Sequence, residues 1–269
     1  MDSIISLKNI NFYYKDKEIF KDFNLEIEKG SFTTIIGTNG SGKSTLVRII
    51  LGLLVCEGEI IINNNILNNE NLKNIISKIG VVFENPDDQF VAETVMDDIA
   101  FSLENMNIEA KEIKSRINKI SKLIGINDIL EREPHSLSGG EKQLVALASA
   151  LVTDPDILIL DEAFTMIDTI DREKIYKILE KLNKISKITI INITHDMDEI
   201  LYGKNLIVID KGNIVLNGPK EYVFLEEKTF NKLGLKLPFM VELTTKLEYY
   251  GLIDHLVFDM EELVDLLWK

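Results

Sequence analysis

Residues 32–50, "FTTIIGTNGSGKSTLVRII", combine a short apolar segment, a glycine-rich turn and a second apolar segment with helical spacing. Residues 37–45, "GTNGSGKST", fit the pattern G-x-x-x-x-G-K-[ST]. The flanking patterns predict a strand before the turn and a helix after it. Glycines let the backbone curl so that several N–H groups and the helix N-terminus face an anion. This stretch therefore predicts a phosphate-binding loop.

The residue types in this loop predict a nucleoside triphosphate as the ligand. Lys43 is expected to reach the β- and γ-phosphates, and Ser44 to ligate Mg²⁺. A glycine turn that merely joins a strand to a helix gives no reason for Lys and Ser at these offsets. The predicted phosphate contacts are Gly37, Thr38, Asn39, Gly40, Ser41, Gly42, Lys43, Ser44 and Thr45.

Outward from the loop, the patterns predict a mostly parallel sheet that is covered on both faces. Four further aliphatic segments, separated by helical patterns, have the character of buried strands. They are "KIGVVF" (78–83), "DILILD" (156–161), "KITIINIT" (187–194) and "NLIVID" (205–210). Before the loop, "SLKNINFYY" (6–14) and "IFKDFNLEI" (19–27) alternate as two antiparallel strands. The predicted fold class is α/β, a P-loop NTPase (RecA-like) core with N-terminal antiparallel strands.

The remaining segments are helical in pattern. Strand signals vanish between residues 86 and 152, where amphipathic patterns predict an α-helical subdomain inserted into the core. We expect a nucleotide-binding domain over 1–225 and a small helical C-terminal unit over 226–269. The apolar stripes of that unit suit either the core or a partner.

Carboxylates and a histidine follow two of the predicted strands. Asp161 and Glu162 end a buried strand, where adjacent acids are costly unless a cation or water uses them. In phosphoryl transfer, an Asp so placed holds Mg²⁺ through the metal's second coordination shell, and we assign the neighbouring Glu162 to the attacking water. His195 follows another strand and should surface at the same sheet edge, within reach of a γ-phosphate.

Residues 137–143, "LSGGEKQ", predict a helix start with Ser138 as N-cap and two glycines that expose backbone N–H groups. With this motif the chain resembles the nucleotide-binding subunits of ATP-binding cassette (ABC) proteins over residues 3–225. The resemblance implies that Ser138, Gly139 and Gly140 act on the nucleotide held by a second ATPase subunit. It also implies adenine stacking on Tyr14, and communication between the two sites through Asp168.

Three further segments are similar to the ATPase subunits of energy-coupling factor (ECF) transporters, which take up vitamins and transition-metal ions. They are "VVFENPDDQFVAETVMDDIAFSLEN" (81–105), "THDMDE" (194–199) and "LGLKLPFMVEL" (233–243). This resemblance implies a transmembrane coupling subunit, whose helix enters a groove beside the loop at 84–89, and a substrate-binding membrane subunit. It implies that the C-terminal unit contributes to dimerisation, with this chain or a paralogue as the second ATPase.

The chain departs from the family pattern at several positions. Glu84 stands where Gln usually contacts magnesium and the attacking water, and we expect it to ligate the metal. With Asp161 and Glu162 it should raise at least one carboxyl pKa by like-charge repulsion. Gln89 is the alternative source of the missing amide. Ala163, Phe164 and Leu144 also replace usual residues, which suits a specialised interface.

Bulk composition narrows the partners. The 269-residue chain has a formal net charge of −14, which disfavours direct binding to nucleic acid or anionic lipid. No apolar run is long enough to span a bilayer, and the N-terminus lacks a signal-peptide pattern. We therefore expect the chain in the cytosol. The resemblance to ECF ATPase subunits implies a peripheral location on the cytoplasmic face of the membrane, held by protein partners.

Besides an ATPase of another type of ABC transporter, two alternatives to an importer ATPase remain. One is a soluble cassette ATPase, although such chains carry a long coiled-coil insertion or two cassettes, and here each motif occurs once. The other is a nonhydrolysing subunit, which the intact Lys43, Ser44, Asp161, Glu162 and His195 disfavour.

Overall fold

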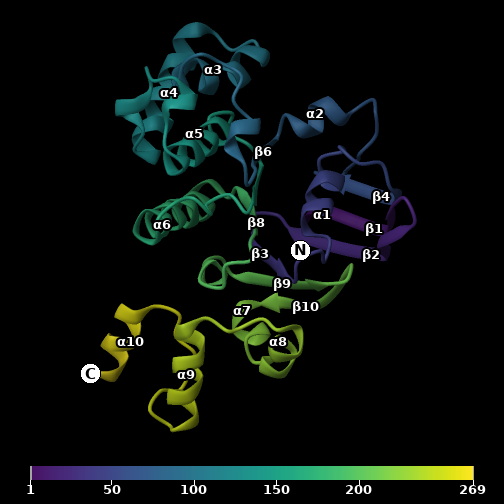
Figure 1. The fold of residues 1–269 in the computed structure, drawn as a ribbon, viewed down its shortest axis with the longest axis vertical. Coiled ribbons are helices and arrows are strands. Elements are labelled where there is room, and N and C mark those ends of the chain that lie inside the picture. Colours follow the sequence, from purple (N-terminus) through teal and green to yellow (C-terminus); the bar gives the residue numbers. More distant parts are fainter. Residues whose placement is uncertain (1, 269) are drawn as a thin grey trace.

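The computed structural model describes residues 2–268, and its centre is a six-stranded sheet (Figure 1). The strand order is β10-β9-β3-β8-β7-β6; β9 to β6 are parallel, and β10 pairs antiparallel with β9. The strands are β3 (Phe32–Gly37), β6 (Ile79–Val82), β7 (Ile157–Asp161), β8 (Thr189–Ile193), β9 (Asn205–Asp210) and β10 (Asn213–Pro219). Every residue of β3, β7 and β8 is buried, as expected for strands covered on both faces.

A second, antiparallel sheet holds the N-terminal strands in the order β2-β1-β4-β5. Its strands are β1 (Ser3–Tyr14), β2 (Lys17–Glu28), β4 (Glu57–Ile62) and β5 (Asn65–Ile66). Helix α1 (Lys43–Ile50) lies between the two sheets and contributes Leu46, Val47, Ile49 and Ile50 to the shared core. Packing on both sides fixes the helix that begins at the phosphate loop.

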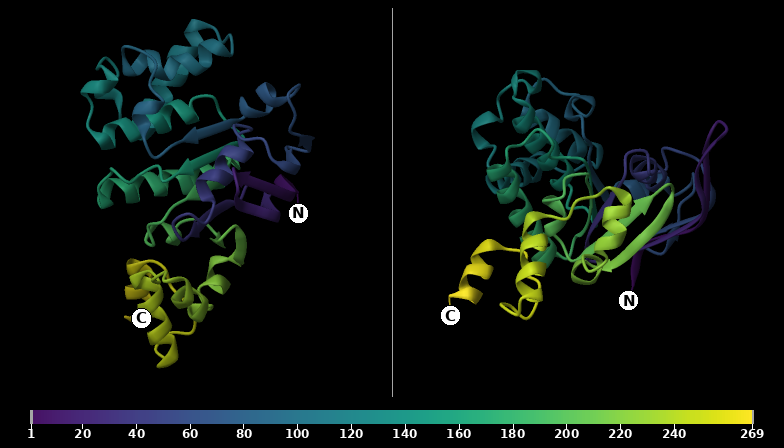
Figure 2. Two further views of the ribbon diagram at one scale, coloured as in Figure 1. Left: turned by 45° about the vertical axis from the view of Figure 1, so that its right-hand side comes forward. Right: turned by 60° about the horizontal axis from the view of Figure 1, so that its bottom comes forward.

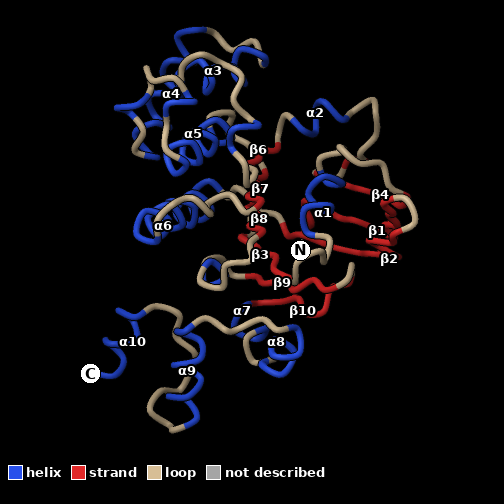
Figure 3. Tube along the Cα trace, in the orientation of Figure 1, coloured by secondary structure: helices blue, strands red, loops and turns tan. Residues whose placement is uncertain are grey.

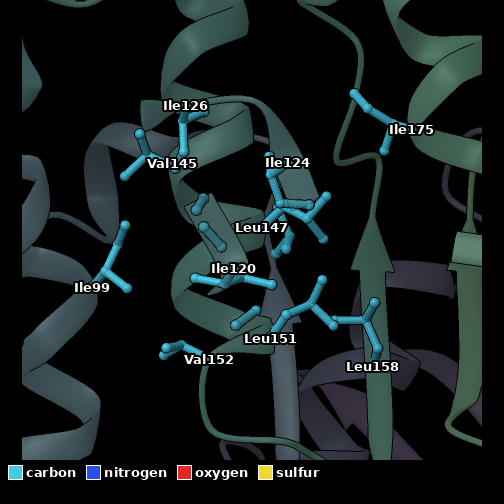
Figure 4. Close-up of a cluster of buried hydrophobic side chains, with 14 of the residues drawn as sticks. Ile99, Ile120, Ile124, Ile126, Val145, Leu147, Leu151, Val152, Leu158 and Ile175 are labelled. Atoms are coloured by element: carbon cyan, nitrogen blue, oxygen red, sulfur yellow. The ribbon is translucent and has the colours of Figure 1, made fainter. Parts of the chain in front are cut away.

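Helices α3 (Val95–Asn105), α4 (Ala110–Ile124) and α5 (Gly139–Leu151) form the insertion between β6 and β7. Figure 4 shows aliphatic side chains of these helices close to Leu158 of β7. Ile175 of α6 (Thr169–Ser186) belongs to the same buried cluster. Because one apolar cluster includes the insertion and the sheet, the start of α5 is held in a defined place relative to the strands. Short helix α2 (Leu72–Ile76) precedes β6.

The C-terminal part of the chain lies at the opposite end of the molecule from α3, α4 and α5 (Figures 1 and 2). It consists of α7 (Lys220–Val223), α8 (Glu227–Leu233), α9 (Phe239–Tyr249) and α10 (Met260–Leu267). Phe230 and Val241 of this part share a core cluster with Leu206 and Val208 of β9. The unit therefore seats its first helices on the β9 side of the sheet.

Figure 3 shows strands confined to the middle of the molecule and helices at both ends of its long axis. This arrangement confirms the predicted fold class, including the inserted helical subdomain and the helical C-terminal unit. Among residues 2–268, no helix combines the length and the apolar character needed to cross a membrane.

Candidate active site

The phosphate loop joins β3 to α1, as the sequence pattern predicts. Gly42, the residue before the helix, has a φ of 110°, and a Cβ there would lie 2.8 Å from the Phe20 ring. A Cβ on Gly37 would lie 2.0 Å from the carbonyl oxygen of Ile209. Glycine is required at these two positions because the loop is pressed against β2 and β9.

Two hydrogen bonds join this loop to the end of β9 and the turn that follows it. Asp210, which accepts one of them, was not predicted as a site residue. The Thr38 hydroxyl donates to Asp210 Oδ1 at 2.8 Å. The N–H of Gly212 donates to the carbonyl of Ser41 at 3.0 Å. Asp210 ends a strand that pairs directly with β3, so an acid at the end of "NLIVID" was the available signal.

Lys43 is buried and folds across the loop that precedes it. Its Nζ donates to the carbonyl oxygens of Gly37 at 2.9 Å and Thr38 at 3.2 Å. Burial lowers the pKa of Lys43, and the charges of Glu162 and Asp161 oppose that shift. Ser44, on the first turn of α1, is exposed. The ammonium group therefore lies inside a loop of carbonyls and backbone N–H groups, with two carboxylates close by.

Asp161 is the buried acid of the site. Burial, followed by the charges of Glu162 and Glu84, raises its pKa to about 6. Its Oδ1 is buried and has no hydrogen-bond partner among residues 2–268. The expected upward pKa shift from three neighbouring carboxylates is thus present, with burial as its largest cause. A partnerless buried carboxylate oxygen is a donor that suits a divalent cation.

Acidic side chains alone do not form a metal cage here. Within the described part of the chain, no three His, Cys, Asp or Glu side chains are clustered closely enough to hold an ion. A cation at Asp161 would therefore need hydroxyl and phosphate oxygens to complete its coordination, which is how Mg²⁺ is held beside substrate phosphates.

Glu162 and His195 meet at the carboxyl ends of neighbouring strands β7 and β8. His195 Nδ1 lies 2.8 Å from Glu162 Oε2. The His195 side chain is 57% exposed and that of Glu162 only 19%, so the imidazole faces outward from a partly shielded acid. The two residues assigned to hydrolysis from sequence are brought together.

The backbone at Glu162 is strained. Its φ is 52°, in the left-handed region that a residue with a side chain rarely adopts, and its N–H donates to the Ile193 carbonyl at 2.8 Å. The bond to β8 holds the residue in this conformation and turns its side chain toward His195.

The acidic loop after β6 places Glu84 near Asp161, whereas the Gln89 side chain is bound to the β6 segment. Glu84 is exposed, close enough to Asp161 to raise its pKa. The Gln89 amide accepts from the Phe83 N–H at 3.1 Å and donates to the Val81 carbonyl at 3.2 Å. Because both ends of that amide are bound to the β6 segment, Gln89 is not free to replace the amide that the family has at position 84.

Ser138 begins α5 with a capping box. The Glu141 carboxylate accepts from the N–H of Ser138 at 2.8 Å, and the Ser138 hydroxyl accepts from the Glu141 N–H at 3.3 Å. The Ser138 hydroxyl also donates to Glu141 Oε2 at 2.9 Å, and the two hydrogen bonds that the carboxylate accepts from Ser138 lower the pKa of Glu141. Ser138, Gly139 and Gly140 make no hydrogen bond to residues 37–45 in the part of the chain described here. These three residues form a surface at the N-terminus of α5 that is separate from the phosphate loop of the same chain.

The last two sequence-predicted residues are also surface positions. Tyr14 ends β1 with 40% of its surface exposed, and its ring meets Phe12 edge-on at 4.9 Å. Asp168 caps α6 by accepting from the N–H groups of Ile170 and Asp171. Over residues 2–268, no hydrogen bond joins either residue to the Glu162–His195 pair.

A phosphate loop, a buried Asp and a Glu–His pair at one edge of a parallel sheet define a nucleoside-triphosphate hydrolase. A model of the ABC transporter family matches residues 20–165. The energy-coupling factor transporter ATP-binding protein EcfA1 of Leuconostoc mesenteroides subsp. mesenteroides is 44% identical over 246 residues, 90% of this chain and 90% of that protein. The chain therefore belongs to the ABC transporter family, as an ATPase subunit of the energy-coupling factor type.

Solved structures agree with this placement. A structure of CbiO1 from Clostridium perfringens, described as part of the ABC transporter complex CbiONQ, superimposes with a TM-score of 0.78 at 34% identity. It covers 90% of this chain and 99% of that one. A dimer of the ATP-binding cassette MJ0796 in a post-hydrolysis state, bound to ADP and Pi, gives a TM-score of 0.74 at 29% identity, covering 80% and 98%.

Proposed function

We propose that this chain hydrolyses Mg²⁺–ATP at the edge formed by the phosphate loop, Asp161, Glu162 and His195, and so drives an importer for a vitamin or a transition-metal ion. The observation that carries the proposal is the Glu162–His195 contact of 2.8 Å beside a buried Lys43. It joins an acid that can orient or deprotonate water to an imidazole that can reach phosphate.

ATP binding is assigned to the loop and to one aromatic residue. The backbone N–H groups of residues 37–45 and the start of α1 face the phosphates, and Lys43 exchanges its loop carbonyls for β- and γ-phosphate oxygens. Tyr14 offers a half-exposed ring for adenine. Burial of Lys43 favours such an exchange, because a buried ammonium gains most from a close anionic partner.

Magnesium is assigned to Ser44, Asp161 and Glu84. The partnerless Oδ1 of Asp161 supports this set, and Glu84 adds a second carboxylate within electrostatic range. When bound there, Mg²⁺ neutralises phosphate charge and fixes the phosphate oxygens.

Hydrolysis is assigned to Glu162 and His195. A carboxylate only accepts hydrogen bonds, so the contact requires His195 Nδ1–H to donate to Glu162 Oε2. That bond fixes the ring and leaves Nε2 available, and Nε2 can donate to a γ-phosphate oxygen when it too carries a proton. The remaining lone pairs of Glu162 orient the attacking water.

One chain supplies only half of each site. Ser138, Gly139 and Gly140 at the start of α5 are directed to the nucleotide of a second ATPase subunit, identical or paralogous. We assign the C-terminal unit, residues 226–269, to the same contact between ATPases. Helix α10 supports this because Met260, Val264, Leu267 and Trp268, spaced along one helical face, are 38–79% exposed.

The membrane partner is assigned to the groove beside the acidic loop. The groove lies between β6, α3 and α5, and Gln89, Asp98, Phe101 and Ala146 are among its lining residues. A coupling helix of a transmembrane subunit seated there would move with the loop that carries Glu84, and a separate membrane subunit would bind the substrate. The chain would then sit peripherally on the cytoplasmic face of the membrane.

Turnover by Glu162→Gln tests the proposal. ATP hydrolysis by the full chain should be lost, while binding of a fluorescent ATP analogue persists, because the phosphate loop is unchanged. Glu131→Gln, at an exposed acid that has no role assigned in the site, is the matched control and should keep wild-type turnover. Normal turnover by Glu162→Gln would exclude Glu162 as the base. If the wild-type chain, assembled with its second ATPase subunit, bound ATP at this site without hydrolysing it, the chain would be a nonhydrolysing subunit.

A further inference from the structure

A buried polar cluster lies behind the Glu162–His195 pair, between α6 and the segment that follows β8. We call Arg172, Tyr176, Asn192, Asp196 and Glu199 the Tyr176 cluster. Tyr176 is fully buried and Glu199 is 5% exposed. The roles assigned to the active site so far use none of these side chains.

The cluster is held by short polar contacts. Tyr176 Oη lies 2.7 Å from Glu199 Oε2 and 3.1 Å from Asn192 Oδ1. Arg172 Nη1 lies 2.7 Å from Asp196 Oδ2 and 3.4 Å from Glu199 Oε1. Two side chains of α6, one turn apart, are thus bound to residues on either side of His195.

The Tyr176 ring extends the cluster to the segment that carries Glu162. Phe164, two residues after Glu162, replaces the usual family residue and meets the Tyr176 ring edge-on, with centroids 5.5 Å apart and planes at 87°. Tyr202 stacks on the Tyr176 ring, with centroids 4.3 Å apart and planes at 6°. One helical side chain therefore contacts the segments that carry both reactive residues.

Keeping a carboxylate at this depth is costly for the fold. Burial raises the pKa of Glu199, and hydrogen bonds from Thr194 and Tyr176 and the charge of Arg172 oppose that shift. When a buried ion pair is replaced by well-packed apolar residues, the protein usually loses no stability. The stability of the fold therefore does not explain why the Tyr176 cluster is polar. The contacts do, however, fix orientation, because the Tyr176 hydroxyl donates to Glu199 and the Arg172 guanidinium to Asp196, each in a defined direction. Within residues 2–268, Asn192 Nδ2 is the one buried side-chain nitrogen of the cluster that has no partner.

We propose that Arg172, Tyr176 and Glu199 are positioning residues, which hold the Glu162–His195 pair in register with the head of α6, where Asp168 caps the helix. This inference rests on the proposed roles of Glu162 and His195. Among the described residues, no hydrogen bond or ion pair joins the three to the phosphate loop, so loosening them displaces the reactive pair and leaves the nucleotide contacts intact. A displacement of that kind lowers kcat and leaves KM for ATP nearly unchanged.

Three substitutions in the full chain test this. Tyr176→Phe removes only the hydroxyl, Glu199→Gln removes only the charge, and Arg172→Gln removes the guanidinium. Each should lower kcat about tenfold, with KM for ATP changed less than about twofold. Arg172→Lys should recover part of the loss, because an ammonium still reaches the Asp196 carboxylate. Because Arg172 is only partly buried, its variants keep the test open if Tyr176→Phe does not fold.

Combining substitutions separates a positioning unit from independent contacts. The double variant Arg172→Gln/Glu199→Gln should be no slower than the slower single variant, since either change already releases the pair. Arg116→Gln, which breaks a comparable ion pair on α4, is the matched control and should keep wild-type kcat. If the cluster variants lose thermal stability but keep wild-type kcat well below their melting temperatures, the cluster is structural only and the proposal is wrong.

Assaying Glu162→Gln in parallel separates a failure of the positioning role from a failure of the proposed function. Loss of turnover in Glu162→Gln with wild-type kcat in the cluster variants would overturn only the positioning role. Normal turnover in Glu162→Gln would overturn the proposed function, and the positioning role with it.

Discussion

Asp161 lowers the stability of the folded chain and is also a residue assigned to bind the metal ion. Its carboxyl is buried at the end of β7, and one of its oxygens has no hydrogen-bond partner within residues 2–268. Burial, and then the charges of Glu162 and Glu84, raise its pKa from 3.8 to about 6. The ionised form therefore destabilises the fold of the metal-free chain at neutral pH.

Asp161→Asn should stabilise the metal-free chain and abolish hydrolysis. The folded-state pKa lies above the unfolded value, so the native state binds the extra proton. The penalty is then full above pH 6 and disappears as the pH falls from about 6 toward 4. Thermal or urea unfolding should give the variant an advantage on the order of 2–3 kcal/mol at about pH 8, and much less at about pH 4.5.

Glu84→Gln is the companion variant in that titration. Removing its charge should shift the pH midpoint of the Asp161 effect downward, because Glu84 is one cause of the raised pKa. If the advantage of Asp161→Asn were equally large at acidic and at alkaline pH, the assignment to Asp161 ionisation would be contradicted.

At the scale of elements, an ion pair links the acidic loop to the helix that Ser138 caps. Lys142 Nζ, on α5, lies 2.6 Å from Asp87 Oδ1 in the one-turn 3₁₀ helix Pro86–Asp88. The buried Gln143 beside it accepts from the Met166 N–H at 3.1 Å. The start of α5 is therefore tied to the loop of Glu84 and to the segment that follows Glu162. One role of the acidic loop at 84–89 is therefore to hold α5 in place through Asp87.

Charge reversal at this pair should weaken coupling between the loop and α5. Asp87→Lys and Lys142→Asp should each lower ATP turnover roughly two- to fivefold, the scale of a partly exposed ion pair, and the double swap should restore it. Steady-state hydrolysis by the four proteins gives the interaction energy. Glu112 and Arg116 on α4 form an ion pair of the same 2.6 Å length, and their swap should change nothing. A double variant whose loss of turnover equals the product of the two single losses would mean that the contact carries no coupling.

At the scale of the molecule, the chain is built to work beside other chains. The helical insertion and the C-terminal unit lie at opposite ends of the sheet, and each presents a surface assigned to a partner (Figure 1). The start of α5 is assigned to a second ATPase, the groove between β6, α3 and α5 to a transmembrane subunit, and α10 to the ATPase contact. Three separate surfaces on one cassette are the arrangement that an assembled transporter requires.

Copurification tests that arrangement directly. The tagged chain, recovered from detergent-solubilised membranes of its native cells, should bring down a cassette ATPase and a multi-helix membrane protein that mass spectrometry identifies. If only soluble partners, or no partners, were recovered, the ATPase activity would still be expected but the transporter assembly would be excluded.

The α10 surface can be tested in the same experiment. Val264→Glu/Leu267→Glu should reduce recovery of the second ATPase, because two charges would enter an apolar contact. Val55→Glu, at a position 93% exposed, is the matched control. Undiminished recovery with the α10 variant would assign the dimer contact elsewhere.

The strongly patterned elements of this protein could be predicted from sequence. The phosphate loop has a fixed spacing, and the buried strands at 156–161, 187–194 and 205–210 are nearly continuous aliphatic runs, so local chemistry identifies them. Strands β4, β5 and β10 were missed. They are short or only partly buried, and their formation depends on pairing with β1 and β9 more than on their own pattern.

The sequence by itself determined the fold class and the residues of the phosphate site, since those follow from periodicity and from chemistry at short range. Only the tertiary structure decided the contact of Glu162 with His195, the bond of Thr38 to Asp210, the commitment of Gln89 to the β6 segment and the Tyr176 cluster. Each of these joins residues of separate elements. Such contacts depend on which strands lie side by side and on how deeply each carboxylate is buried, and spacing along the chain encodes neither.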